Sequence, residues 1–122
     1  MIDMDGLKPI NDAHGHRIGD AVLVEFSKRL KRITRETDTA ARLGGDEFGV
    51  ILTPLETPDG VGHAAQRIES AIAPPFVFED GTYPLRASIG HALVPEDGTE
   101  PDHLLDVADR RMYAVKKSRK PR

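Results

Sequence analysis

The sequence predicts an α+β fold in which helices pack on a mixed, mainly antiparallel sheet. Short alternating apolar segments flank glycine-containing turns, as in β-hairpins, and longer segments with apolar residues at helical spacing lie between them. The expected order is strand, loop, helix, two strands, helix, two strands, helix. Strands interleaved with helices in this way are typical of ferredoxin-like domains.

The first 20 residues are rich in Asp, Gly, His and Asn and show no amphipathic period, so we expect a loop there. Asp3 and Asp5 share one side of an extended segment, and Met4 between them exposes its main-chain carbonyl. Such a group of oxygens suits a hard divalent cation.

Two other metal sites fit this region less well. A calcium-binding helix-loop-helix motif is rejected because Gly6 comes too early for that loop. His14 and His16 lack a third clear ligand, so we interpret them as structural or loop histidines and not as zinc ligands.

A long helix is expected from Gly19 onward, ending near residues 35–38. Its apolar stripe consists of Val22, Leu23, Phe26, Leu30 and Ile33. Taken alone, Arg35 and Asp38 at its end would form a surface ion pair worth less than about 1 kcal/mol.

A hairpin is expected next, with residues 40–43 leading in and residues 48–52 leading out. Gly44 and Gly45 occupy the positions where a tight turn needs positive φ. Asp46 and Glu47 then begin the second strand, where adjacent acids rarely serve packing. A solvated hairpin with charged turn residues is the alternative.

The remaining chain predicts a helix, a second hairpin and a last helix. Residues 57–59 form the N-cap and first turn of the helix, which Pro74 and Pro75 stop. The second hairpin has arms at residues 76–78 and 83–94, joined by a turn at residues 79–81.

Two features complete this C-terminal part. Gly90 lies inside the second arm of the second hairpin and indicates a close approach of another backbone. Residues 95–102 form a loop, and Asp102 caps the last helix, whose apolar stripe runs from Leu104 to Val115.

The composition of the chain argues against some classes of function. The chain has 122 residues, no Cys and a formal net charge of −3, which fits one domain and gives no basic surface for nucleic acid. No apolar run approaches the roughly 20 residues that span a bilayer, so we expect no membrane segment in this chain. The expected location is cytoplasmic, either alone or as part of a longer protein tethered to a membrane.

The sequence resembles the GGDEF family of diguanylate cyclase domains, which condense two GTP molecules into cyclic di-GMP. Its signature is Gly44-Gly45-Asp46-Glu47-Phe48. Further matches occur in family order and spacing at Asp3-Met4-Asp5-Gly6-Leu7-Lys8, Ile10-Asn11-Asp12, Gly15-His16, Gly19-Asp20, Ser88-Ile89-Gly90, Ala108-Asp109, Met112-Tyr113 and Lys116. The resemblance covers nearly the whole chain and implies the palm fold of nucleotidyl cyclases.

The resemblance also implies a set of site residues. Asp3, the carbonyl of Met4 and Asp46 would bind Mg²⁺ (or Mn²⁺) on the GTP triphosphate, with Glu47 and Lys116 as further catalytic groups. The residues implied to bind the substrate are Asn11 and Asp20 at the guanine edge, together with Gly6, Leu7, Lys8, Gly44, Gly45 and Lys120.

Regulation and assembly follow from the same resemblance. Arg35 and Asp38 stand where the family has its Arg-x-x-Asp product-inhibition motif, and Arg67 matches a further arginine of that site. Each subunit would hold one GTP, so catalysis requires a homodimer.

The chain departs from the family pattern at both ends. It lacks the usual N-terminal helix and most of the first strand, which would leave neighbouring strands unpaired and the metal ligand poorly anchored. Near the C-terminus, either Lys120 or Arg119 replaces the usual phosphate-contacting arginine. The alternatives to a cyclase are therefore a catalytically silent module that binds GTP or cyclic di-GMP within a larger signalling protein, and a truncated remnant.

Overall fold

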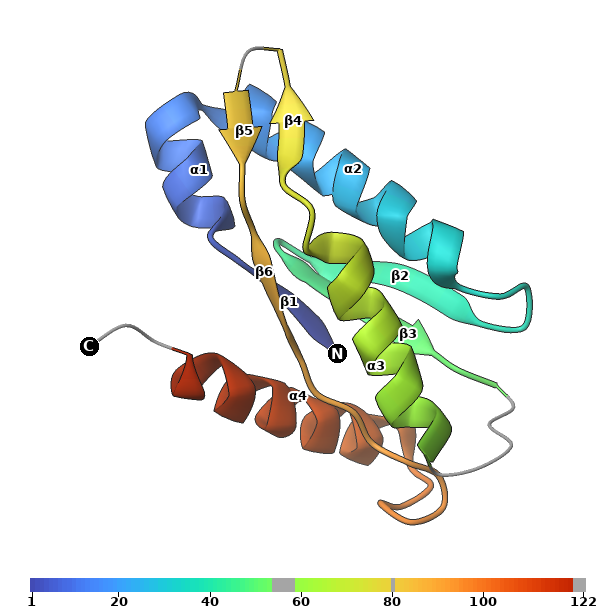
Figure 1. Cartoon of the computed structure of the whole chain (residues 1–122). Helices are drawn as coiled ribbons and strands as arrows, with labels where there is room; N and C mark the ends of the chain where they lie inside the picture. Colours follow the sequence, from blue (N-terminus) through green and yellow to red (C-terminus); the bar gives the residue numbers. More distant parts are fainter. Residues whose placement is uncertain (54–58, 80, 120–122) are drawn as a thin grey trace.

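The structure is a computed structural model that describes residues 1–53, 59–79 and 81–119. Its elements are β1 (Ile2–Asp5), α1 (Leu7–His14), α2 (His16–Ile33), β2 (Thr39–Gly44), β3 (Glu47–Ile51), α3 (Asp59–Ile72), β4 (Phe76–Phe78), β5 (Gly81–Tyr83), β6 (Arg86–Ile89) and α4 (Pro101–Ser118). The main sheet has the order β2-β3-β1-β6, and β4 pairs with β5 separately (Figure 1). The described strand pairs are antiparallel, which confirms the predicted α+β class.

Strand β1 lies in the middle of the main sheet. Ile2 stands opposite Phe48 on β3 and opposite Ile89 on β6, and the Met4 N–H donates to the Asp46 carbonyl at 2.9 Å. The side chains of Ile2 and Met4 are buried in the core. Within residues 2–5, β1 thus pairs with a strand on each side, and the expectation of unpaired neighbouring strands stays a prediction.

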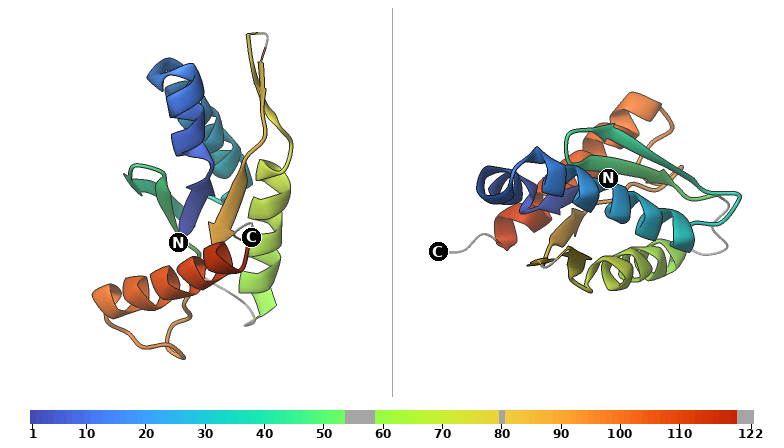
Figure 2. Two further views of the ribbon diagram at one scale, coloured as in Figure 1. Left: turned by 90° about the vertical axis from the view of Figure 1, so that its left-hand side faces the viewer. Right: turned by 90° about the horizontal axis from the view of Figure 1, so that it is seen from above.

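The two faces of the sheet differ in chemistry. One face carries apolar side chains of β1, β3 and β6, which pack with those of α2 and α3 into one core. The other face carries Asp3, Asp5 and Ser88, and α4 covers it. Helices α3 and α4 thus lie on opposite sides of the sheet (Figure 2). The alternation of strand side chains produces this division, since successive residues of β1 point to opposite faces.

The core is centred on aromatic contacts between α2 and the sheet. Phe26 is fully buried, and its ring lies 4.7 Å from that of Phe48 on β3.

No helix among the described residues is both long enough and apolar enough to cross a bilayer.

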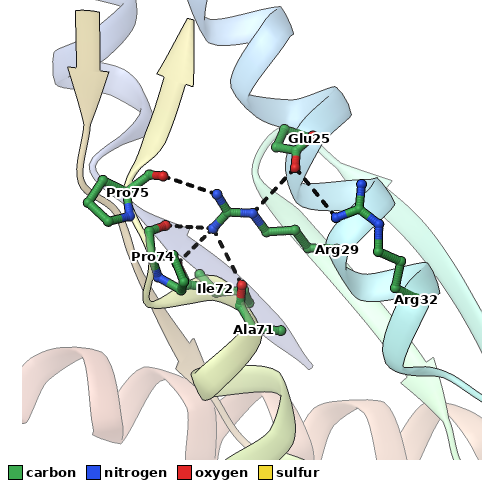
Figure 3. Close-up of polar contacts among 7 residues, drawn as sticks. All are labelled: Glu25, Arg29, Arg32, Ala71, Ile72, Pro74 and Pro75. Carbon is green, nitrogen blue, oxygen red and sulfur yellow. Dashed lines mark hydrogen bonds and ion pairs between the residues drawn. The ribbon is translucent and has the colours of Figure 1, made fainter.

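Arg29 on α2 closes the C-terminal end of α3 (Figure 3). Its guanidinium donates hydrogen bonds to four main-chain carbonyls, those of Ala71, Ile72, Pro74 and Pro75. It also lies 3.9 Å from the centre of the Phe76 ring, and Glu25 approaches its Nε at 3.5 Å. The last carbonyls of a helix lack intrahelical donors, and the two prolines have no N–H, so Arg29 supplies the donors that this segment lacks.

Gly90, just after β6, lies directly against α4. A Cβ atom at this position would lie 2.1 Å from the Met112 nitrogen and 2.3 Å from the Ala108 oxygen. Both atoms belong to the helix backbone and cannot rotate away. The predicted close approach at Gly90 is confirmed, and it sets how near α4 lies to the sheet.

The N-terminal region differs from the prediction, because residues 7–14 form α1 and α2 starts at His16 instead of Gly19. In α1, Leu7 is buried and Ile10 is half-buried. The apolar residues Leu7, Ile10 and Ala13 span only two helical turns among polar neighbours, so the segment was wrongly interpreted as a loop.

The second hairpin also differs from the prediction, because its expected second arm is two strands in two sheets. Strand β5 ends at Tyr83, and β6 begins at Arg86 and ends at Ile89. Pro84 lies between them, and its missing N–H interrupts a strand ladder. Residue 80 of the predicted turn lies outside the described residues.

Helix α4 begins two residues earlier than predicted. Glu100, and not Asp102, is the N-cap of α4; Pro101 is its first residue, and Asp102 lies in the first turn. The predicted cap at Asp102 is therefore wrong by two residues, because Pro101 favours the first helical position and the Asp102 carboxylate favours the positive end of the helix dipole in the first turn. The predicted start of α3 at Thr57 and Pro58 falls outside the described residues.

Replacing Gly90 with Ala should destabilise the fold by about 1–3 kcal/mol, because the new methyl group must push α4 away from β6. Urea unfolding measures this loss. Gly62→Ala on α3 is the matched control: a Cβ there meets nothing within 4 Å, so this change should stabilise the protein by about 0.5–1 kcal/mol. Equal stability of the two variants would contradict the close packing of α4.

Arg29→Lys should lower the free energy of unfolding by about 1–2 kcal/mol, because an ammonium group cannot reach four carbonyls arranged around a planar guanidinium. Arg32→Lys is the control, since Arg32 pairs with the same Glu25 but is mostly exposed. We expect the control to lie within about 0.5 kcal/mol of the wild type in urea unfolding. A similar loss in both variants would show that the carbonyl contacts of Arg29 contribute nothing.

Candidate active site

Carboxylates gather where β1 passes the tip of the β2–β3 hairpin. Asp3 on β1 stands opposite Glu47 on β3, and Asp46 precedes Glu47 in the turn. Asp3 is only 6% exposed, which is unusual for a carboxylate. The backbone bond from Met4 to Asp46 holds the hairpin tip against β1. The two carboxylates that the resemblance implies as metal ligands, Asp3 and Asp46, are thus close in space.

Lys116 on α4 reaches across the polar face of the sheet to these acids. Its Nζ lies 2.8 Å from Asp3 Oδ2 and 3.7 Å from Asp5 Oδ1. The hydrogen bond with Asp3 raises the pKa of Lys116, so this side chain stays charged. The buried Ser88 hydroxyl donates to Asp5 Oδ2 at 2.7 Å. Asp5, which the sequence already indicated as a cation-binding group beside Asp3, is therefore a member of the cluster. Ser88 is a member too, although the predicted site residues did not include it.

Both Asp3 and Glu47 have raised pKa values. Burial raises the pKa of Asp3 and the nearby Asp46 charge adds to this, while the hydrogen bond from Lys116 opposes it. Burial also raises the pKa of Glu47, with further contributions from Asp109, Asp3 and Asp46. The site thus concentrates negative charge beyond what Lys116 neutralises.

The signature turn has a defined shape. Gly45 adopts φ of +48°, a conformation that favours glycine, and its carbonyl accepts two hydrogen bonds from Arg42, at 3.0 and 2.8 Å. Sequence reasoning gave Arg42 no role. Its position three residues before Gly45 is the sequence feature that could have indicated this role, since a side chain can bridge a turn at that spacing.

The N-terminus of α1 opens beside the acids. Gly6 is the N-cap residue with φ of +102°, and it directly follows Asp5. The first N–H groups of a helix have no partners within the helix and can bind a phosphate. Leu7 is buried and anchors this turn, while Lys8 is exposed. The backbone N–H groups at the start of α1 thus directly follow the acids of β1.

Asn11 and Asp20 lie at the corner where α1 meets α2. The Asn11 carboxamide packs against Gly19 so closely that a Cβ at Gly19 would lie 1.7 Å from Asn11 Oδ1. That oxygen is buried and has no hydrogen-bond partner among the described residues. Asp20, the next residue after Gly19, is exposed. The corner therefore offers an amide and a carboxylate to a ligand.

Arg35 and Asp38 form a compact pair between α2 and β2. Asp38 accepts hydrogen bonds from the Arg35 main chain at 2.8 Å and from its guanidinium at 3.3 and 3.2 Å. Burial of Asp38 would raise its pKa, but the bonds from Arg35 and Thr53 outweigh this and lower the pKa. The pair lines a hollow of about 470 Å³ whose other walls include Lys31, Arg42 and Phe48.

Arg67 does not line this hollow. It lies on α3 in a second, more open hollow with Ile33, His63 and Gln66. The two hollows meet α2 at neighbouring positions, Ile33 and Thr34. A ligand that contacts Arg35 and Arg67 together must therefore extend around the C-terminal end of α2.

The two candidates for the phosphate-contacting cation near the C-terminus differ. Arg119 donates to the Ala87 carbonyl at 2.6 Å and approaches Glu69 on α3 at 3.6 Å, so it clamps the edge of β6. Lys120 lies outside the described residues.

The donor set fits a hard divalent cation. Asp3 Oδ1 and Asp5 Oδ1 are buried and find no hydrogen-bond donor within residues 1–53, 59–79 and 81–119. No group of three or more His, Cys, Asp or Glu side chains converges as a metal site in these same ranges. The expected site differs from such a cluster, because it uses two carboxylates and a main-chain carbonyl.

The chain is similar to known sequences along its whole length. Residues 1–122 match the family model for the diguanylate cyclase GGDEF domain. The bifunctional diguanylate cyclase/cyclic di-GMP phosphodiesterase MucR of Pseudomonas aeruginosa is 40% identical over 116 residues, 95% of this chain and 17% of MucR. The diguanylate cyclase TpbB of the same species is 42% identical over 118 residues, 96% of this chain and 27% of TpbB. The chain thus spans about a quarter or less of these relatives.

Solved structures show the same architecture. The crystal structure of the GGDEF domain of TpbB (YfiN) superposes with a TM-score of 0.92 at 42% identity, covering 96% of this chain and 73% of that one. The GGDEF domain of DgcB from Caulobacter crescentus, solved in complex with c-di-GMP, gives 0.85 at 25% identity, covering 99% and 72%. This chain belongs to the GGDEF family of diguanylate cyclase domains.

Proposed function

We propose that the chain is a diguanylate cyclase domain that condenses two GTP molecules into cyclic di-GMP and releases pyrophosphate. The observation that carries this proposal is the buried Asp3 carboxylate beside Asp46 at the signature turn, with Lys116 bound to it. Burying acids together is costly, so a fold that keeps them indicates that the charge is used.

Asp3, Asp46 and the Met4 carbonyl would hold Mg²⁺ or Mn²⁺ on the triphosphate. A cation there neutralises phosphate charge and supports displacement at the α-phosphorus. Lys116 already carries a positive charge next to these acids and would share the neutralisation of the phosphates.

Glu47 would accept the proton of the attacking ribose 3′-hydroxyl. Its raised pKa makes it a better base than an ordinary carboxylate. The 3′-oxygen of one GTP then bonds to the α-phosphorus of the other, and pyrophosphate leaves. Two such reactions close the ring, so two pyrophosphates are released for each cyclic di-GMP.

Substrate recognition would divide between two regions. The backbone around Gly6, Leu7 and Lys8, the turn at Gly44 and Gly45, and Lys120 would contact the phosphates. Asn11 and Asp20 would contact the guanine edge, where the buried Asn11 oxygen still needs a donor. Adenine would leave these groups unpaired, which provides selectivity.

Assembly and feedback complete the proposal. A single subunit would hold one GTP, so two subunits must face each other in a homodimer. Arg35 and Asp38 line a hollow large enough for part of a dinucleotide, and Arg67 would contact the rest from α3. Cyclic di-GMP bound there would inhibit the enzyme.

Asp46→Asn should lower cyclic di-GMP synthesis by at least about 100-fold, because even indirect partners of metal ligands cost about 10- to 100-fold. It should spare product binding. Arg35→Ala should do the reverse and weaken product binding by about 10- to 100-fold through lost charged hydrogen bonds. Nucleotide chromatography and calorimetry measure the two effects.

The opposite pattern, with synthesis lost in Arg35→Ala and product binding lost in Asp46→Asn, would overturn both assignments. Unchanged synthesis in Asp46→Asn would overturn the proposed site. Product binding by a wild type that never forms product would instead favour a regulatory binding module.

Asp3→Asn should raise the urea midpoint of the metal-free protein at pH 7 while abolishing synthesis. Because burial raises the pKa of folded Asp3, its protonation favours the folded state, and that stability is lost as pH rises through the folded pKa. The neutral amide avoids this loss, so its advantage should shrink as pH falls toward 4, the usual carboxyl range. Exposed Glu96→Gln is the control and should change stability by less than about 0.5 kcal/mol. Lower stability of Asp3→Asn at pH 7 would contradict the electrostatic account.

A further inference from the structure

The β4–β5 hairpin lies outside the main sheet, beside the ends of α1 and α2 that meet at the corner (Figure 1). Phe76 at its base is fully buried, whereas Phe78 and Tyr83 are half-buried against the core. The corner itself extends beyond the four-stranded sheet. The hairpin is therefore the part of the structure next to the corner that can support it from this side.

Two contacts join the hairpin to the corner. The Tyr83 ring meets the His14 ring edge to face, with centroids 5.1 Å apart and an angle of 83° between the planes. The Glu79 carboxylate pairs with the Arg17 guanidinium. His14 is the last residue of α1 and Arg17 the second of α2, so the hairpin contacts both helices next to their junction.

The junction needs such support. Gly15 between the helices has φ of +87°, and a Cβ there would meet nothing within 4 Å. No side chain at position 15 itself therefore contributes to the angle between α1 and α2, which depends on the contact of Asn11 with Gly19 and on the packing of neighbouring elements. Asn11 lies one turn before His14, and Asp20 lies one turn after Arg17.

The two contacts differ in how strongly they hold the hairpin to the corner. The Arg17–Glu79 pair is exposed, and solvent screens such pairs strongly. The aromatic contact between Tyr83 and His14 is half-buried on the Tyr83 side and orients both rings. Tyr83 is thus the main contact.

We propose that Tyr83 is a positioning residue for guanine recognition: through His14 it holds the α1–α2 corner, and so positions Asn11 and Asp20 for the base. This inference rests on the proposed function, because it assumes that the corner binds guanine. Tyr83 itself contacts neither the base nor the phosphates. Its loss should weaken binding of the base and leave the phosphate contacts at β1 and the signature turn unchanged.

The test is calorimetry with 3′-deoxy-GTP and 3′-deoxy-ATP in Mg²⁺, since neither nucleotide has the attacking hydroxyl. Tyr83→Ala should weaken 3′-deoxy-GTP binding by about three- to tenfold, the size of an aromatic pair. Binding of 3′-deoxy-ATP should stay unchanged, so the guanine preference falls by the same factor. Tyr83→Phe keeps the ring and should restore the wild-type preference.

Two further variants complete the design. His14→Ala removes the same contact from an exposed position and should lose the same guanine preference, which decides the question if Tyr83→Ala does not fold. Thr82→Ala, the exposed neighbour on the opposite face of β5, should behave as wild type.

The outcomes distinguish a failure of the proposed function from a failure of the positioning role of Tyr83. A wild type that binds both nucleotides equally overturns the proposed function and this inference together. A wild type that prefers 3′-deoxy-GTP, with a Tyr83→Ala or His14→Ala variant that keeps this preference or weakens both nucleotides equally, overturns the positioning role alone.

Discussion

The structure depends on the burial of Asp3 next to Asp46, balanced by Lys116 from α4. A lone buried carboxylate would be protonated or expelled, since removing its charge from water is expensive. The 2.8 Å bond from Lys116 keeps the charge in place, but burial and Asp46 still raise the pKa of Asp3. The fold thus retains an electrostatic cost that a bound cation would relieve.

The packing of α4 makes this arrangement possible. Gly90 allows the helix backbone to approach β6 to a distance that any side chain would prevent, and Lys116 then reaches Asp3 and Asp5 from the same helix. On the opposite face, Arg29 closes the end of α3 and keeps the apolar layer together. Separate contacts on the two faces therefore hold β1 between them, with its acids on one side and Ile2 and Met4 on the other.

The sequence predicted the elements whose signals are local. The signature hairpin, the core helices and Gly90 all followed from turn chemistry and periodicity, and the structure agrees. Helix α1 was missed because its apolar pattern spans only eight residues. The packing of Leu7 in the core holds this helix in place. The split at Pro84 was missed because strand pairing is decided by distant partners. Ser88 and Arg42 were missed as site residues because their roles depend on contacts in space.

The most direct test of the central claim is nucleotide analysis of the purified chain incubated with GTP and Mg²⁺, counting both products. We expect cyclic di-GMP together with two pyrophosphates for each molecule formed, and neither product when a chelator is present. If GTP remains intact both with this chain and with a longer chain extended upstream, while cyclic di-GMP still binds, then the buried acids do not serve catalysis and the cyclase proposal is wrong.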